Sequence, residues 1–176
     1  MRIIGGKYRG RTLVPFKGSD VRPTSDRAKE ALFNILSPEI SGANMLDLFC
    51  GSGSVGLEAI SRGADLVVFN DSSRESLSIL EKNLALLKES AKIYNLDYRV
   101  LLKQLDITFD IIFLDPPYKS DAGEQALRLI SERKLLNTGG IAVLESDKPF
   151  EGSIPDLVKY DERRYGIACL TFFTPD

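Results

Sequence analysis

The chain has 176 residues, of which 43% are apolar and 27% are charged, and a formal net charge of −2; these values are typical of one globular domain. No apolar run approaches the length of a membrane span, and the N-terminus lacks the apolar stretch of a secretory signal. The chain has no histidine, and its two cysteines, Cys50 and Cys169, fit no metal-ligand spacing. We therefore expect no metal site and a reducing, cytoplasmic location.

Positive charge is concentrated at the N-terminus. Residues 1–29 contain eight Lys or Arg residues against two Asp residues, a net charge of +6 that leaves −8 on the rest of the chain. Such a segment can bind a phosphate backbone, although it can also be a solvated tail. Tyr8 and Phe16 lie among the cations and favour RNA contact, so residues 1–23 are interpreted as a basic arm. The candidate RNA contacts are Lys7, Arg9, Arg11 and Arg22.

Residues 2–14 predict a short β-hairpin within this arm. Apolar residues at 3–4 and 13–14 lie on either side of Gly5-Gly6 and Gly10. A polar loop follows, and Thr24 or Ser25 can then cap a helix that ends before Pro38.

The stretch Asn44–Ala59 combines a buried strand, a glycine-rich turn and a helix. Met45–Phe49 is an apolar run broken only by Asp47, and it leads into Gly-Ser-Gly-Ser-Val-Gly at 51–56. Strand, glycine turn and helix together bring backbone N–H groups close to a ligand.

A second apolar run, Leu66–Asn70, ends in Asp71, about 20 residues after Gly51. An acidic side chain there can bind the two hydroxyls of a ribose. Both a dinucleotide and S-adenosylmethionine carry such a ribose, so the loop and the acid leave two ligands open.

The remaining segments alternate between strand and helix patterns. Expected strands are 91–96, 110–114 and 141–145, the last preceded by a turn at 137–140. Expected helices are 73–87, 99–105 and 123–134. An antiparallel pair at 157–161 and 167–173 closes the chain. This alternation predicts a doubly wound α/β sheet.

Asp115-Pro116-Pro117-Tyr118 follows a predicted strand, where open α/β sheets bind ligands. The prolines stiffen the backbone and remove two N–H donors. Asp115 and the Pro116 carbonyl can accept hydrogen bonds from an exocyclic amine, and Tyr118 can stack on its base. Hydride transfer needs no such set, so the motif favours S-adenosylmethionine, although D-P-P-Y alone could be a strand-ending turn.

D-x-F-x-G-x-G at 47–53 followed by D-P-P-Y resembles the class I S-adenosylmethionine-dependent methyltransferases that act on exocyclic amines of nucleobases. RIIGGKYRGR at 2–11 and RPTSDRAKEALFNIL at 22–36 resemble the RsmD family, bacterial enzymes that methylate guanine N2 in small-subunit (16S) ribosomal RNA. The resemblance covers nearly the whole chain. It implies a Rossmann-like sheet of seven strands with the last antiparallel, in a single domain over residues 1–176. It also implies 16S rRNA within an assembling 30S subunit as the partner of a monomer.

The resemblance also implies a cofactor site, which would hold S-adenosylmethionine. Asp71 is expected at the ribose, although Asn70 beside it leaves some choice. Asp97 is expected at the adenine amine, although an acid there can simply cap a helix. The expected cofactor residues are Asp47, Phe49, Gly51, Gly53, Asp71 and Asp97.

Other functions remain open from the sequence. An adenine-N6 or cytosine-N4 methyltransferase often carries extra residues that read duplex DNA, and this chain has no room for them. A protein-glutamine methyltransferase would be expected to carry Asn in place of Asp115. A non-catalytic RNA-binding assembly protein would not need D-P-P-Y.

Overall fold

The computed structural model describes residues 1–15, 26–117 and 120–176. The strands are β1 (Asn44–Asp47), β2 (Leu66–Asn70), β3 (Lys92–Tyr94), β4 (Phe109–Leu114), β5 (Leu136–Ser146), β6 (Leu157–Tyr165) and β7 (Ala168–Pro175). The helices are α1 (Asp26–Ile35), α2 (Ser54–Ser61), α3 (Arg74–Leu87), α4 (Tyr98–Gln104) and α5 (Ala122–Glu132), with a 3-10 turn, η1 (Gly6–Tyr8). Within the described ranges, no helix is long and apolar enough to cross a membrane.

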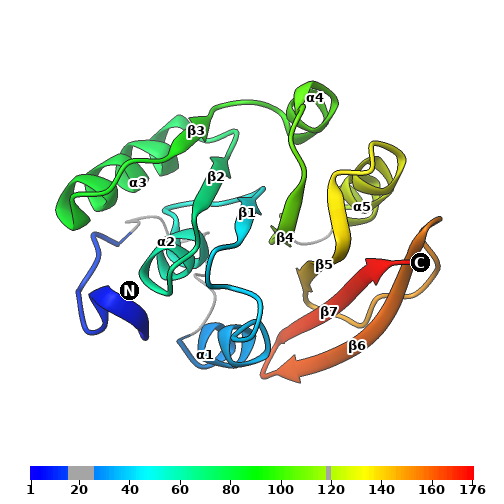
Figure 1. Cartoon of the computed structure of the whole chain (residues 1–176), viewed down its shortest axis with the longest axis horizontal. Coiled ribbons are helices and arrows are strands. Elements are labelled where there is room, and N and C mark those ends of the chain that lie inside the picture. The colour runs from blue at the N-terminus through cyan, green and yellow to red at the C-terminus, as the bar shows by residue number, and fades with distance from the viewer. Residues whose placement is uncertain (16–25, 118–119) are drawn as a thin grey trace.

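The seven strands form one sheet in the order β3-β2-β1-β4-β5-β7-β6 (Figure 1). Strands β1 to β5 pair in parallel, and β7 is antiparallel to both of its neighbours. The expected seven-stranded class I methyltransferase sheet with an antiparallel last strand is therefore confirmed. The order reverses after β3, so the carboxyl ends of β1 and β4 lie side by side at the middle of the sheet.

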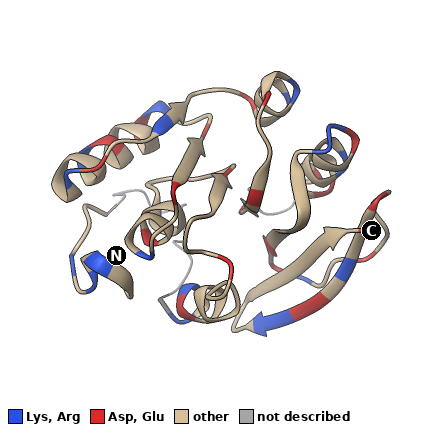
Figure 2. Cartoon of the chain, viewed as in Figure 1, with Lys and Arg blue, Asp and Glu red and all other residues tan. Residues whose placement is uncertain are grey.

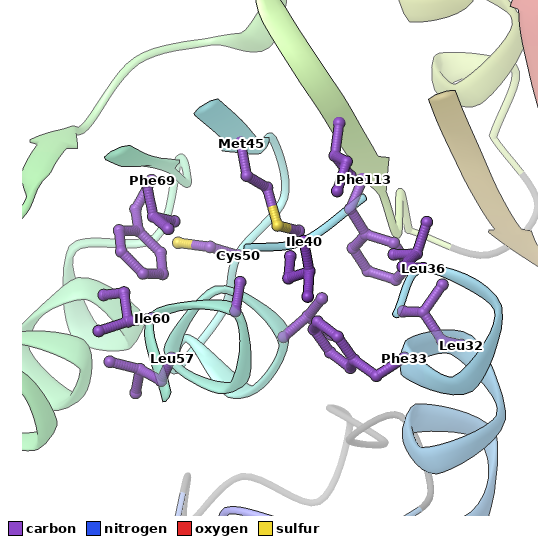
Figure 3. Packing of buried hydrophobic residues seen from close by; sticks show 14 of the residues in the cluster. Leu32, Phe33, Leu36, Ile40, Met45, Cys50, Leu57, Ile60, Phe69 and Phe113 are labelled. Carbon is purple, nitrogen blue, oxygen red and sulfur yellow. The ribbon is translucent and has the colours of Figure 1, made fainter. Parts of the chain in front are cut away.

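Helices cover both faces of the sheet, which is why the central strands are apolar almost throughout. In β4, Ile111 and Phe113 join the core beneath α1, α2 and α3, whereas Ile112 and Leu114 join the core beneath α4 and α5. Figure 3 shows the first core, where Phe33 of α1 lies in the same cluster as Phe113. Helix α2, with every residue from Val55 to Ser61 buried, is enclosed by this core.

One predicted turn is wrong. Residues 137–140 belong to β5, which pairs with β4 from Leu136 onward and shifts register before Ile141. The irregular stretch is stabilised by Asp110, whose carboxylate accepts hydrogen bonds from the side chain of Asn137 at 2.7 Å and the backbone of Asn44 at 2.8 Å. The Asn-Thr-Gly-Gly sequence thus forms a bulge within β5 and not a turn that precedes it.

The predicted N-terminal β-hairpin is also wrong. Only one isolated bridge, Arg2 with Thr12, forms across the described N-terminal segment, residues 1–15. Between its ends the chain forms η1 and packs on the end of α2. Gly6 adopts φ +74°, and a Cβ there would lie 1.8 Å from the carbonyl oxygen of Ser61. This contact requires glycine for two reasons, the backbone conformation and the close approach.

We predict that Gly6→Ala lowers the free energy of unfolding more than Gly10→Ala does. Both glycines have positive φ, but a Cβ at Gly10 would meet nothing within 4 Å. The backbone cost of about 1–2 kcal/mol is shared, and only Gly6→Ala adds a clash of roughly 1–3 kcal/mol. Urea denaturation measures both. Equal destabilisation would mean that the segment is not packed on α2.

Candidate functional site

The glycine loop between β1 and α2 is held by the protein's own carboxylates. The backbone N–H of Gly51 donates to Asp71 at 2.8 Å, and that of Gly56 donates to Asp47 at 2.9 Å. The N–H of Gly53 donates to the Cys50 carbonyl at 2.8 Å. Three amides that sequence patterns would assign to a ligand are therefore already used. A pyrophosphate, which needs such donors, is poorly served by this loop.

The loop nevertheless leaves space for a ligand. Gly51 has φ +53°, and a Cβ on it would meet no atom within 4 Å. Gly53 and Gly56 face inward instead, because a Cβ would lie 2.4 Å from Leu80 and 2.2 Å from Phe69 respectively. Two of the three glycines thus serve packing, and the first one opens towards the site.

Asp71 and Asn70 have different surroundings. Asn70 is 1% exposed; its amide nitrogen donates to the Leu48 carbonyl at 3.1 Å and its oxygen accepts from the Leu96 backbone at 3.3 Å. Asp71 is partly exposed, and its two oxygens accept from Gly51 and, at 2.8 Å, from Ser73. Of the two side chains, only Asp71 retains exposed acceptor capacity.

Asp47 is a buried acid, with 1% exposure. Burial raises its pKa to about 7; the Gly56 hydrogen bond opposes this shift and the charge of Asp71 adds to it. A cation bound nearby would favour the ionised form.

Asp115 directly follows β4, beside the end of β1, and it stays partly exposed. Burial of its carboxyl raises the pKa of Asp115 well above the ordinary value. The charges of Glu145, Asp47 and Asp71 raise it further. The acidic groups that raise the pKa of Asp115 therefore come from the ends of the neighbouring strands β2, β1 and β5. Among the described residues, none of them belongs to a group that could hold a metal ion.

A cavity of about 640 Å³ lies at the carboxyl end of β5 and is lined by Pro116 and Pro117, which directly follow Asp115. This volume falls within the range of about 300–1,000 Å³ common for small-ligand sites. Its walls come from Pro116-Pro117, the start of α5, the end of β5 and residues 147–151. Apolar surfaces of Leu144 and Phe150 alternate there with acidic side chains. Tyr118, expected to stack on the base, lies outside the described residues.

Asp97 caps α4. Its side chain accepts the Arg99 backbone N–H at 2.9 Å and two guanidinium hydrogen bonds from the same residue, also at 2.9 Å. The Arg99 hydrogen bonds lower the pKa of Asp97 to about 2. The neighbouring Tyr98 ring lies 5.3 Å from the ring of Phe49, and this aromatic pair joins α4 to the loop after β1.

The predicted RNA contacts differ in their surroundings. Arg9 and Arg11 are exposed. Lys7 is exposed too, but its ammonium lies 2.6 Å from Glu89, so its charge is partly compensated. Figure 2 shows the cations of the N-terminal segment beside α2, and mixed charges on α3 and β6. Arg22 lies outside the described residues.

Two acids were missed from the sequence. Glu145 has a usable signal, since it ends the predicted strand 141–145 just as Asp115 follows strand 110–114. Glu58 has none, because nothing in a helix pattern distinguishes a buried carboxylate from an exposed one. In the structure Glu58 is fully buried and binds the N-terminal segment.

A family model, curated proteins and solved structures that resemble this chain all point to one family. The family model described as conserved hypothetical protein 95 matches residues 1–174. Ribosomal RNA small subunit methyltransferase D of Haemophilus influenzae is 41% identical over 153 residues, which span 84% of this chain and 79% of that protein. The solved structure of yhhF from Escherichia coli is 34% identical with a TM-score of 0.91, over 100% of this chain and 98% of that chain.

A further solved structure contains ligands. The Thermus thermophilus 16S rRNA N2 methyltransferase RsmC, in complex with AdoMet and guanosine, is 25% identical with a TM-score of 0.71, over 92% of this chain and 45% of that chain. The family match over nearly the whole chain and the close relatives agree with the motifs at 2–11 and 22–36. The chain therefore belongs to the family described as conserved hypothetical protein 95, the RsmD family.

Proposed function

We propose that the protein transfers a methyl group from S-adenosylmethionine to the exocyclic N2 amine of a guanine in small-subunit (16S) ribosomal RNA. The observation that carries this proposal is the position of Asp47, Asp71 and Asp115 at the carboxyl ends of the adjacent strands β1, β2 and β4, beside a glycine loop that is open at Gly51. The names of the curated relatives support the same activity.

The acidic character of the site suits this cofactor. S-adenosylmethionine, when bound, supplies an electrophilic methyl group on a positively charged sulfur. Carboxylates stabilise a cation and repel the pyrophosphate of a nicotinamide dinucleotide. Asp47 and the loop at Gly51 would hold the methionine part, and the exposed oxygens of Asp71 would accept hydrogen bonds from the ribose hydroxyls. The Phe49–Tyr98 pair and Asp97 would hold the adenine.

The D-P-P segment would hold the target amine. Asp115 and the Pro116 carbonyl accept its two N–H groups, which favours a pyramidal nitrogen with an available lone pair. Orientation of this lone pair towards the methyl group is the main catalytic contribution of the protein. Since the pKa of Asp115 lies above the ordinary value, its ionised form is a better proton acceptor for the product than a normal carboxylate. The proton leaves through Asp115 or through water.

The cavity beside Asp115 favours guanine among the nucleobases. Guanine presents two donor groups at adjacent positions, N1–H and the N2 amine, whereas adenine presents an acceptor at N1. An acidic wall that includes Glu145 can accept the N1–H of guanine while Asp115 and the Pro116 carbonyl hold the N2 amine. The base must leave its stack to enter, and Tyr118 is the proposed stacking surface.

The N-terminal segment would bind the RNA backbone. Arg9 and Arg11 are the strongest candidates because they are exposed, with Lys7 and Arg22 as further contacts. The acidic body would repel phosphate elsewhere, which orients the RNA. We further propose that a monomer acts on 16S rRNA within an assembling 30S subunit.

The first prediction of this proposal concerns pH. Below pH 7, Asp47 of the free protein is mostly protonated, because its pKa is raised to about 7. A bound cation favours the ionised form, so binding must release protons and the affinity for S-adenosylmethionine should fall as pH falls below 7. The decrease is at most about tenfold per pH unit for each proton released. Titration calorimetry at pH 6 in buffers of different ionisation enthalpy counts these protons.

Two controls accompany this measurement. S-adenosylhomocysteine lacks the charge on sulfur and should release fewer protons. Asp47→Asn keeps an acceptor for the Gly56 N–H but cannot ionise, so it should lose most of the pH dependence. Equal proton release for both ligands would contradict a carboxylate site tuned to the sulfonium charge.

The second prediction concerns Asp115. Asp115→Asn should lower single-turnover methylation of unmodified small subunits by about 10²-fold or more, because it removes the charged acceptor at the reacting amine. Cofactor affinity should change far less. Asp121→Asn is the matched control, since Asp121 lines the same cavity at the start of α5. Near-normal rates for Asp115→Asn would show that D-P-P-Y only terminates a strand.

A further inference from the structure

We infer that Glu58 and Lys29 are positioning residues for methyl transfer, because they join the N-terminal segment to the glycine loop through α2. RNA held by the N-terminal segment and cofactor held by the loop would then strengthen each other's binding. This inference rests on the proposed function for the identity of the two ligands, but the coupling itself follows from contacts within the protein.

Glu58 is the centre of the connection. Its side chain is fully buried in the middle of α2. One carboxylate oxygen accepts the Gly5 backbone N–H at 2.7 Å and the Arg62 guanidinium at 2.8 Å, and the other accepts the Ile4 N–H at 2.8 Å. A buried carboxylate is stable only with such partners, so departure of the N-terminal segment would remove two of the hydrogen bonds that offset the burial of Glu58.

Lys29 extends the connection to the glycine loop. This α1 side chain is also fully buried, and its ammonium lies 3.6 Å from Glu58. The ammonium donates to the Arg2 carbonyl at 2.7 Å and to the Ser54 hydroxyl at 3.2 Å. Ser54 is the first residue of α2 and directly follows Gly53 of the loop. One charged group thus contacts the N-terminal segment, α1 and the start of α2.

Two polar side chains add parallel connections. At the end of α2, the Ser61 hydroxyl donates to the Gly5 carbonyl at 2.6 Å and accepts the Tyr8 N–H at 2.9 Å. At the loop itself, the fully buried Asn83 bonds both backbone groups of Val14 and donates to the Ser52 carbonyl at 3.3 Å. The N-terminal segment is therefore attached at both ends of the unit formed by the loop and α2.

The direction of the coupling follows from these contacts. A contact between RNA and Arg9 or Arg11 fixes the N-terminal segment, and the segment fixes the helix whose first turn borders the cofactor. Any favourable effect of RNA on cofactor binding must be returned equally, because coupling between two ligands is reciprocal. A network that only stabilises the fold would change unfolding without changing this coupling.

The test measures the affinity for S-adenosylhomocysteine, which avoids turnover, with and without saturating small subunits reconstituted from unmodified rRNA. In the unaltered protein, the ratio of the affinity with small subunits to the affinity without them should be at least about five. Ser61→Ala removes two hydrogen bonds of α2 without creating a buried charge, and it should lower the ratio towards one. Ser131→Ala is the matched control. Ser131 is a buried serine of α5 whose hydroxyl donates to the Pro155 carbonyl, and its loss should leave the affinity ratio unchanged.

A double variant, Lys29→Met with Glu58→Gln, tests the ion pair itself. It removes the Lys29 and Glu58 charges together, so neither is left buried without the other, and Arg62, which loses its carboxylate, keeps partial access to water. The affinity ratio should then fall to one. Urea midpoints show whether each variant folds; if the double variant does not, Ser61→Ala decides the question. The inference is overturned if the S-adenosylhomocysteine affinity of the unaltered protein is the same with and without small subunits. It is also overturned if the folded double variant, or Ser61→Ala, keeps the same affinity ratio as Ser131→Ala. Failure to bind S-adenosylhomocysteine at all would instead reject the proposed function.

Discussion

Two hydrogen bonds from the glycine loop to the carboxylates of Asp47 and Asp71 determine the chemistry of the site. They use backbone donors that a phosphate ligand would require, and they place negative charge at the carboxyl ends of β1 and β2. Asp115 is then held at a raised pKa, first by burial of its carboxyl and second by the like charges around it, and a bound cation would lower this pKa. The same arrangement disfavours a pyrophosphate-containing cofactor and favours a sulfonium, and in the proposed reaction it would also provide a proton acceptor for the amine.

Helix α2 connects this chemistry to the rest of the molecule. Its N-terminal end borders the glycine loop, its C-terminal end receives Gly5 and Gly6, and Glu58 between them is buried against both α1 and the N-terminal segment. The basic residues that would bind RNA are thus not on an independent arm. They lie on a segment that packs on the glycine loop and α2, so the proposed RNA contacts and the proposed cofactor contacts are joined through one helix.

The sequence predicted elements whose pattern is local. The bounds of β2 were predicted at both ends, and α3 lies within the expected range 73–87 with Ser73 as its cap, because burial and capping leave period and composition signals. Contacts between distant segments left no such signal. Gly5-Gly6 suggested a hairpin turn, whereas their role is to approach α2. Asp97 could be a cap or a ligand, and the structure shows the cap while its role towards adenine stays a proposal.

Methyl transfer to guanine N2 is the central claim, and identification of the product nucleoside tests it most directly. The protein would be incubated with methyl-labelled S-adenosylmethionine and small subunits that carry unmodified 16S rRNA, with genomic DNA in a parallel reaction. After digestion to nucleosides and chromatography, all label should appear as N2-methylguanosine from the rRNA. Label in N6-methyladenosine, in N4-methylcytidine or in DNA, or no transfer to rRNA at all, would contradict the account.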